Sequence, residues 1–275
     1  MPRDAPAAPN HQRADGRAEL TLAAAPGGAR LRHLYQAAPL RWLFPDAEAD
    51  EPKTGALVNV AGGLAGGDRL ESTLRLGPGA RFTATTPAAE KIYRSLGEET
   101  TIAAAITVED GAVCEWLPQE TILFDGARLR RRIGFELAPA ARLLAAEMLV
   151  LGRAAHGETF RRGALRDTWR VRRGGALVWA DALHLADPAG ARSPFRLGAA
   201  NALATILLAA PEAESLRPRA RELSGGGATL PAPGLLLLRW LGEAGTLRAS
   251  VAAAVAALRE AAFGHPSRLP RLWRT

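Results

Sequence analysis

Apolar and polar residues alternate along much of the first two thirds of the chain. Residues 70–76 (LESTLRL) place leucines on one face and charged or hydroxyl side chains on the other, and residues 102–108 repeat this alternation. A period of two is typical of β-strands that bury one face. The pattern predicts a mainly β fold over residues 19–195.

Turn-like sequences recur between the alternating stretches, and each is followed by another strand-like run. They are APGGAR (25–30), GPGARF (77–82), EDGAVC (109–114) and APAARL (138–143). The last three begin 32 and 29 residues apart. A fifth turn, RRGG, has strand patterns on both sides. This recurrence predicts stacked β-hairpins in a solenoid-like or layered sandwich architecture.

The pattern changes after Pro194. Leu203, Ile206 and Leu207 have helical spacing, and the run LLLLRWLG that follows Gly234 is typical of a buried strand. Thr246 is then expected to cap a helix that ends at Gly264. The end of the chain therefore reads as helix, strand, helix.

Three segments follow from these patterns. Residues 1–18 are polar and rich in alanine and proline, which predicts a disordered N-terminal tail. Residues 19–195 are expected to form the β-rich domain, and residues 196–275 a helical portion packed on it.

The composition favours acidic partners. The net charge is +7, and only Lys53 and Lys91 are lysines among 35 basic residues. No array of aromatic residues accompanies the arginines, so binding to nucleic acid is a minor alternative. Cys114 is the only cysteine and lies in a strand pattern, which suits a buried thiol and a reducing compartment. With no apolar signal-peptide core and no apolar run of bilayer length, we expect a cytoplasmic protein without membrane contact.

The glycine-rich stretch NVAGGLAGGDRL (59–70) could be a phosphate-binding loop or a backbone corner. In a phosphate-binding loop, lysine and the N-terminus of a helix usually face the anion. Here Asp68 and Arg69 follow the glycines, and the next residues have the period of a strand. The corner is therefore the better interpretation, since glycine allows positive φ and close backbone approach.

Catalytic motifs are scarce. GxSxG is absent, and His156 and Glu158 form an HxE pair without the PCxxC partner of a zinc deaminase. The absence of a dense catalytic constellation favours a binding or scaffolding protein.

Two stretches combine acidic residues with arginines in a way that suggests more than folding. They are EWLPQETILFDGARLRRR (115–132) and VLGRAAHGETFRRG (150–163). Salt bridges between these acids and the neighbouring arginines are the alternative explanation.

Several motifs together resemble a known family. AGGLAGGDRL, LGPGARFTATTPAAEKIYRS, WLPQETILFDGA, LGRAAHGE and the closing PRLWRT occur in this order. From about residue 55 to the end, the chain is similar to the urease accessory protein UreD family, called UreH in some organisms.

The resemblance implies a mostly β protein without catalysis of its own and without a permanently bound cofactor. Members form a complex with the accessory protein UreF, which bridges to the GTPase UreG, and the assembly docks on apo-urease and loads nickel. Nickel in transit would pass through an internal channel, where Asp125 of FDGA and Glu158 of GRAAHGE are the candidate guides by motif.

Two further expectations concern the C-terminal segment and an alternative function. The segment PRLWRT should be structural, with Trp273 packed on the body and Arg271 or Arg274 paired to an acid. The alternative function is a carbohydrate-active enzyme on a β-solenoid. Its paired carboxylates would have to come from Glu115, Glu120 and Asp125.

Overall fold

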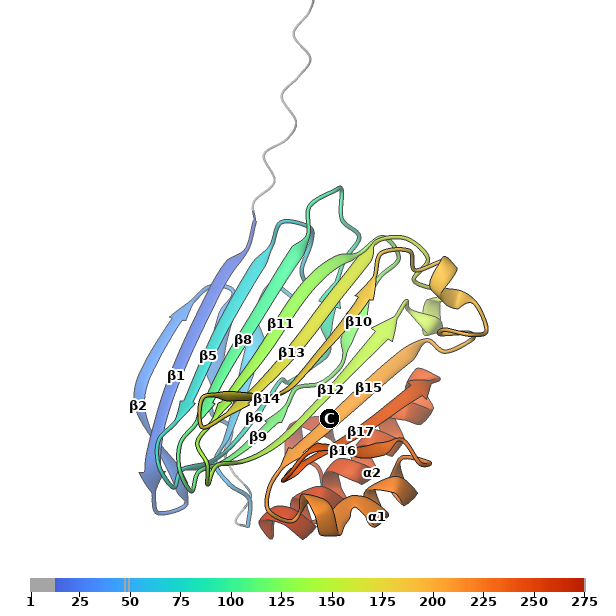
Figure 1. Ribbon diagram of the computed structural model, residues 1–275. Helices are drawn as coiled ribbons and strands as arrows, with labels where there is room; N and C mark the ends of the chain where they lie inside the picture. Colours follow the sequence, from blue (N-terminus) through green and yellow to red (C-terminus); the bar gives the residue numbers. More distant parts are fainter. Residues whose placement is uncertain (1–12, 47, 49, 275) are drawn as a thin grey trace, which may run out of the picture.

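The computed structural model describes residues 13–46, 48 and 50–274, which form two β-sheets with the helices gathered at one corner (Figure 1). The seven-stranded sheet has the order β14-β13-β11-β8-β5-β1-β2. Its strands are β1 (Asp15–Ala25), β2 (Gly28–Ala37), β5 (Arg69–Leu76), β8 (Thr100–Val108), β11 (Arg128–Leu137), β13 (Ala164–Arg173) and β14 (Ala176–Leu185).

The ten-stranded sheet has the order β16-β17-β15-β12-β9-β6-β4-β3, and β10 and β7 extend it beside β12. Its strands are β3 (Leu40–Leu43), β4 (Thr54–Asn59), β6 (Arg81–Thr85), β7 (Glu90–Ile92), β9 (Val113–Leu117), β10 (Thr121–Leu123), β12 (Arg142–Leu151), β15 (Ala202–Ala209), β16 (Ala228–Ala232) and β17 (Leu235–Gly242). The helices are α1 (Ala213–Leu223) and α2 (Ala244–Phe263), with short 3-10 turns η1 (Ala154–His156), η2 (Gly190–Arg192) and η3 (Arg271–Trp273).

A repeated unit builds the centre of the molecule. In each unit a strand of the seven-stranded sheet is followed by a tight turn and a strand of the ten-stranded sheet: β5–β6, β8–β9 and β11–β12. Successive units stack in parallel, β5 on β8 on β11 and β6 on β9 on β12. The predicted mainly β, solenoid-like fold is confirmed.

Most of the repeated turns do not close hairpins, in contrast to the prediction. The turns at 77–82, 109–114 and 138–143 carry the chain from one sheet to the other, whereas those at 25–30 and 172–175 close antiparallel hairpins. A turn between two sheets and a turn within one sheet use the same glycine-rich residues, so the turn sequence alone does not distinguish them.

Two apolar cores lie on opposite faces of the ten-stranded sheet. The core between the sheets contains Leu143 and Ala145 of β12, and the core beneath the helices contains the alternate residues Leu144 and Ala146. Because both faces of this sheet are covered near β12, β15 and β17, these strands are apolar almost throughout. Helices α1 and α2 thus pack on the ten-stranded sheet, but β15, β16 and β17 of residues 196–275 are strands of that sheet, so the predicted division at residue 195 does not separate a helical portion from the β-sheets.

Three predictions about the tail, one helix and one helix cap were wrong. Residues 15–18 belong to β1 and not to a disordered tail, because Ala18 is buried and β1 pairs with β2 and β5. Residues 1–12 of that predicted tail lie outside the described residues. The apparent helix around Leu203 is β15, a strand buried on both faces. Helix α2 is capped by Glu243, whose carboxylate accepts hydrogen bonds from the Thr246 and Gly245 amides.

The predicted end of α2 is confirmed, since Gly264 adopts the left-handed conformation there. The glycine-rich stretch is a backbone corner between β4 and β5. At Gly63 the ring of Tyr93 occupies the space that a Cβ would need. The Asp68 carboxylate accepts hydrogen bonds from the Ala65 and Ala14 amides at 2.7 and 2.9 Å, and so ties the corner to the start of β1.

Candidate functional site

Two cavities lie between the sheets and adjoin each other. The first, of about 90 Å³, is lined by residues of β3, β4, β5, β7, β8, β9, β10, β11 and β12. The second, of about 150 Å³, lies between β11, β13 and β14 on one side and β12, β15 and β17 on the other. Arg131 and Glu147 line both cavities, so the cavities meet at this pair of side chains.

Arg131 is the centre of a buried ionic cluster. Its Nε and Nη2 donate to the two oxygens of Asp167, each at 2.9 Å, and its Nη1 donates to Glu147 at 2.6 Å and to Thr121 Oγ1 at 3.1 Å. The indole Nε1 of Trp116 donates to the other oxygen of Glu147 at 3.2 Å. Arg131, Glu147 and Asp167 are 4%, 6% and 7% exposed, so the cluster lies in the interior.

Strand alternation brings these residues together. In β11 Arg131 has the same parity as the buried Leu129 and Ile133, while Arg130 and Arg132 point outward. Asp167 is the direct neighbour of Arg131 in the parallel register of β11 and β13. Glu147 reaches the cluster from β12 in the facing sheet.

The cluster contains one guanidinium and two carboxylates. Burial raises the pKa of Glu147, and the Asp167 charge raises it further, while Arg131 acts in the opposite direction without cancelling the shift. Burial lowers the pKa of Arg131, but the two carboxylates outweigh it and the net shift is upward. The arginine therefore stays charged, and the cluster has one more acid than base.

Glu90 is a second polar residue of the first cavity. The amide nitrogen of Asn59 donates to its two oxygens at 3.0 and 3.2 Å. Burial raises the pKa of Glu90 to about 7. Within the described part of the chain no salt bridge reaches this carboxylate. The cavities are therefore lined by acidic groups with too few cations to balance them.

A different buried cluster lies beneath α2. The Glu115 carboxylate of β9 accepts hydrogen bonds from Nε and Nη2 of Arg259 at 2.6 and 3.0 Å. Arg259 also donates to Glu51 at 2.5 Å. The imidazole Nδ1 of His265 lies 3.2 Å from Glu115. Burial acts to raise the pKa of Glu115, but His265 and Arg259 outweigh it and bring the pKa to about 2.

Asp125 and Glu158 lie next to each other in two loops, away from the residues that line the two cavities. The Asp125 amide donates a hydrogen bond to Glu158 at 3.1 Å. Arg153 donates to the two oxygens of Glu158 from Nε and Nη2 at 3.1 and 2.6 Å. The Asp125 carboxylate binds Arg162 at 2.5 Å and the backbone amide of Arg161 at 2.9 Å. Arginine pairing is thus present at both residues, and their place on a nickel path stays a prediction.

Arginine also holds the pKa values of these two acids low. At Glu158 the hydrogen bond from Arg153 lowers the pKa, and burial only partly opposes it. At Asp125 burial acts to raise the pKa, but Arg162 and the backbone amides outweigh it.

The acids proposed for a glycosidase do not form a pair. Glu115 binds Arg259, Glu120 binds Arg248 and Asp125 binds Arg162. Each carboxylate is engaged by a different arginine, so the carbohydrate-active alternative gains no support. Burial raises the pKa of the Cys114 thiol, which is fully buried as expected.

The structure contains functional candidates that sequence reasoning missed. Glu147, Asp167 and Glu90 line the cavities but were not singled out, and Arg131 lies in the stretch 115–132 without being distinguished from its neighbouring arginines. The available signal was an acid or arginine at an inward parity of a strand whose neighbours at that parity are leucine or isoleucine. Among the described residues, no group of three or more His, Cys, Asp or Glu side chains is arranged to hold a metal ion.

The C-terminal expectation is confirmed. Trp273 is 6% exposed, and its Nε1 donates to the Leu117 carbonyl at 2.8 Å. Arg274 pairs with Glu48 at 2.5 Å. The described helices include none that combines the length and the hydropathy needed to cross a bilayer.

Comparison with known proteins agrees with these observations. The sequence profile of the family described as UreD urease accessory protein matches residues 14–274. A urease accessory protein UreD of Granulibacter bethesdensis is 52% identical over 237 residues, which cover 84% of this chain and 99% of the relative. The UreD proteins of Magnetococcus marinus and Azorhizobium caulinodans are 45% and 44% identical, over 90% and 97% of this chain and 89% and 98% of theirs. The chain, with its two stacked sheets and buried inter-sheet acids, belongs to the UreD family of urease accessory proteins.

Proposed function

We propose that this protein is a non-enzymatic scaffold that delivers nickel to apo-urease together with UreF and the GTPase UreG, and that nickel crosses it through the inter-sheet cavities. The observation that carries the proposal is the excess of buried carboxylates over cations around the two adjoining cavities. A passing dication would supply the positive charge that this interior lacks.

The ligand chemistry of the cavities suits transfer better than storage. Carboxylate, amide and hydroxyl oxygens of Glu90, Asn59, Thr121 and Glu147 line the first cavity. Oxygen ligands bind a borderline dication such as Ni²⁺ less tightly than an imidazole and thiolate site. Several weak oxygen sites in series would pass the ion on, whereas one tight site would retain it.

Partners and compartment belong to the same proposal. UreF binds the protein directly, UreG joins through UreF, and the assembly meets apo-urease. The single cysteine is buried and needs no oxidising compartment, which supports a cytoplasmic place of action.

Activation of purified apo-urease tests this function. Mixtures of apo-urease, UreF, UreG, GTP and nickel should reach full urease activity only when this protein is added. The double variant Asp125→Ala/Glu158→Ala should retain UreF and UreG association and lose activation at limiting nickel if these acids guide the ion. Equal activation with and without the protein would overturn the proposed function, whereas normal activation by the double variant would remove only these two residues from the path.

A further inference from the structure

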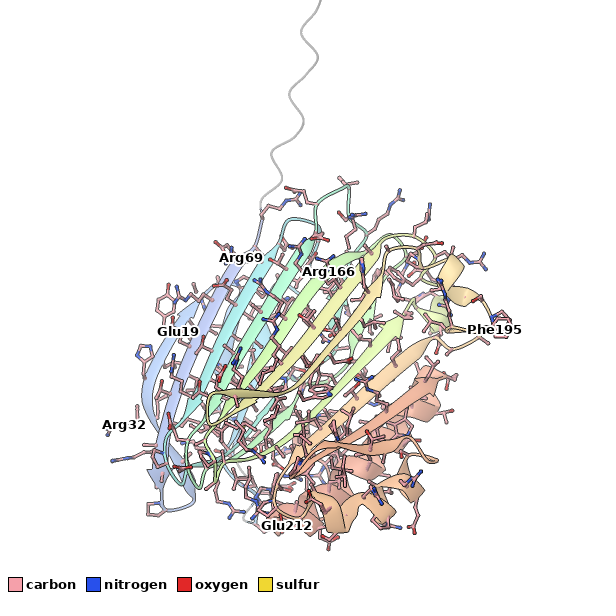
Figure 2. All side chains as sticks on the ribbon, in the orientation of Figure 1. Glu19, Arg32, Arg69, Arg166, Phe195 and Glu212 are labelled. Carbon is pink, nitrogen blue, oxygen red and sulfur yellow. The ribbon has the colours of Figure 1, made fainter. Side chains whose placement is uncertain are left out.

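The outer face of the seven-stranded sheet carries a basic hollow. This face looks toward the viewer in Figure 1, and none of the described helices covers it. The hollow has a volume of about 570 Å³, and it lies over β5, β8, β11 and β13. Its positive side chains are Arg130, Arg132, Arg166 and Arg170. We call this cavity the arginine hollow. Figure 2 shows side chains covering this face, with Arg166 on its upper part.

Strand alternation explains the concentration of charge. The outward positions of β11 and β13 hold the arginines, while the outward positions of β8 hold Ala103 and Ala105. In the register of the sheet Arg130 lies directly opposite Arg166. Like charges in directly opposed positions destabilise a sheet, so the fold gains nothing from this arrangement.

The central arginines differ from those at the rim. Arg130 pairs with Glu99 at 2.6 Å, and Arg172, just outside the hollow, lies 3.7 Å from Glu136. For Arg132, Arg166 and Arg170 the described part of the chain provides no salt bridge, and all three are exposed. Glu71 also lines the hollow, but its carboxylate pairs with Arg69. The hollow therefore contains three arginines whose guanidinium groups no carboxylate of the described residues binds.

The floor of the hollow allows a ligand to approach the sheet closely. It consists of the small outward-facing residues Ala103, Ala105 and Gly134, with the hydroxyls of Thr73 and Thr168 beside them. An extended polypeptide could lie on this floor, while the arginine guanidinium groups bind its carboxylates in the bidentate geometry that arginine favours.

We propose that the arginine hollow is a docking site for a carboxylate-rich segment of a partner protein, bound by Arg132, Arg166 and Arg170. A single-stranded nucleic acid is the rival ligand for such a surface. The lining residues include no aromatic side chain on which bases could stack, which favours the acidic polypeptide. The hollow and the first cavity share lining residues of the sheet that separates them, but Arg132, Arg166 and Arg170 line the hollow and neither cavity, so the docking groups are distinct from those of the nickel path.

Fluorescence anisotropy with a labelled oligoglutamate peptide tests the proposal on the full chain. The peptide should bind saturably, and Arg132→Thr/Arg166→Thr/Arg170→Thr should weaken binding by about tenfold, as expected for the loss of three exposed ion pairs. Threonine suits an exposed strand position, and circular dichroism checks that the variant is folded.

A control variant removes the same charge elsewhere. Arg30, Arg32 and Arg217 are exposed and lie outside the lining of the hollow, so Arg30→Thr/Arg32→Thr/Arg217→Ala should bind the peptide like wild type. An equal loss in both variants would indicate only non-specific charge and would overturn the proposal. Absence of saturable binding, or tighter binding of an oligothymidylate of equal charge that depends on the same arginines, would also overturn it.

Discussion

Two buried arginines each bind two carboxylates, yet their surroundings differ in charge balance and in space. Arg259 binds Glu115 and Glu51 between β9 and α2, and His265 adds a further polar contact. Arg131 binds Glu147 and Asp167 at the junction of two cavities. An arginine with two carboxylates thus occurs both in the packed region beneath α2 and beside the inter-sheet cavities.

The pKa values show what the difference means. In the cluster beneath α2, the pKa of Glu115 is lowered to about 2, so the fold favours its charged form. In the inter-sheet region the pKa of Glu147 is raised, and that of Glu90 is raised to about 7. A carboxylate in a cavity whose charged form the fold disfavours is a candidate functional group, whereas the arginine-bound Glu115 is a candidate support of the fold.

The largest expected effect follows from removing the cation of the packed cluster. Arg259→Met should lower the free energy of unfolding by about 3–5 kcal/mol, because it leaves Glu115 buried without its main partner. Urea denaturation measures this change, with Arg217→Met on the exposed face of α1 as control. A loss below about 1 kcal/mol would mean that the cluster does not support the fold.

Glu115→Gln should have the next largest effect. Lowering a pKa from 4.5 to about 2 corresponds to about 3 kcal/mol of stability at neutral pH. Because the folded pKa is the lower one, wild type has this contribution above about pH 4.5 and loses it as the pH falls toward 2.

Denaturation between pH 2 and 7 therefore distinguishes the two proteins. The variant should be less stable than wild type at pH 7, and the two should converge at low pH. Parallel stability curves across this range would contradict the assignment of Glu115 as a stabilising carboxylate.

Glu90→Gln should raise the free energy of unfolding, whereas Glu115→Gln should lower it. Because the folded pKa of Glu90 is raised to about 7, the native state retains a proton that the unfolded chain releases near pH 4.5, and this group costs stability as the pH rises between these values. Above pH 7 the variant should be more stable than wild type by about 1–3 kcal/mol, the lower end reflecting the partial exposure of the side chain. Thermal denaturation at pH 5 and pH 8 checks this, and a variant that is less stable at pH 8 would contradict it.

The sequence was informative where one face of a strand is covered and the other is open. The alternation of residues 102–108 identified β8, and the regular spacing of turns identified the stacked architecture. Alternation fails where both faces of a strand are covered, and the apolar run of β15 therefore resembles a helix, because no solvent-facing residues mark its period of two. The cap of α2 differs from the prediction because threonine is a preferred N-cap type and glutamate is not, yet here the Glu243 carboxylate accepts the hydrogen bonds of the first amides.

The candidate site was harder to predict than the fold. Arg131 stands within a run of arginines, and only the parity of Leu129 and Ile133 marks it as inward. Its partners Asp167 and Glu147 come from two other strands in two different sheets, so their meeting depends on strand register and sheet stacking. Motif resemblance led instead to Asp125 and Glu158, which do lie together but are bound by arginines outside the cavities.

Urease activation by Glu90→Gln is the most direct test of the claim that the inter-sheet acids serve nickel transfer and not the fold. The variant should associate with UreF and UreG normally and equal or exceed the stability of wild type, yet activate apo-urease several-fold less at limiting nickel. Glu109→Gln, which removes an exposed carboxylate at a turn, should activate like wild type. Normal activation by a correctly assembled Glu90→Gln variant at limiting nickel would contradict the account.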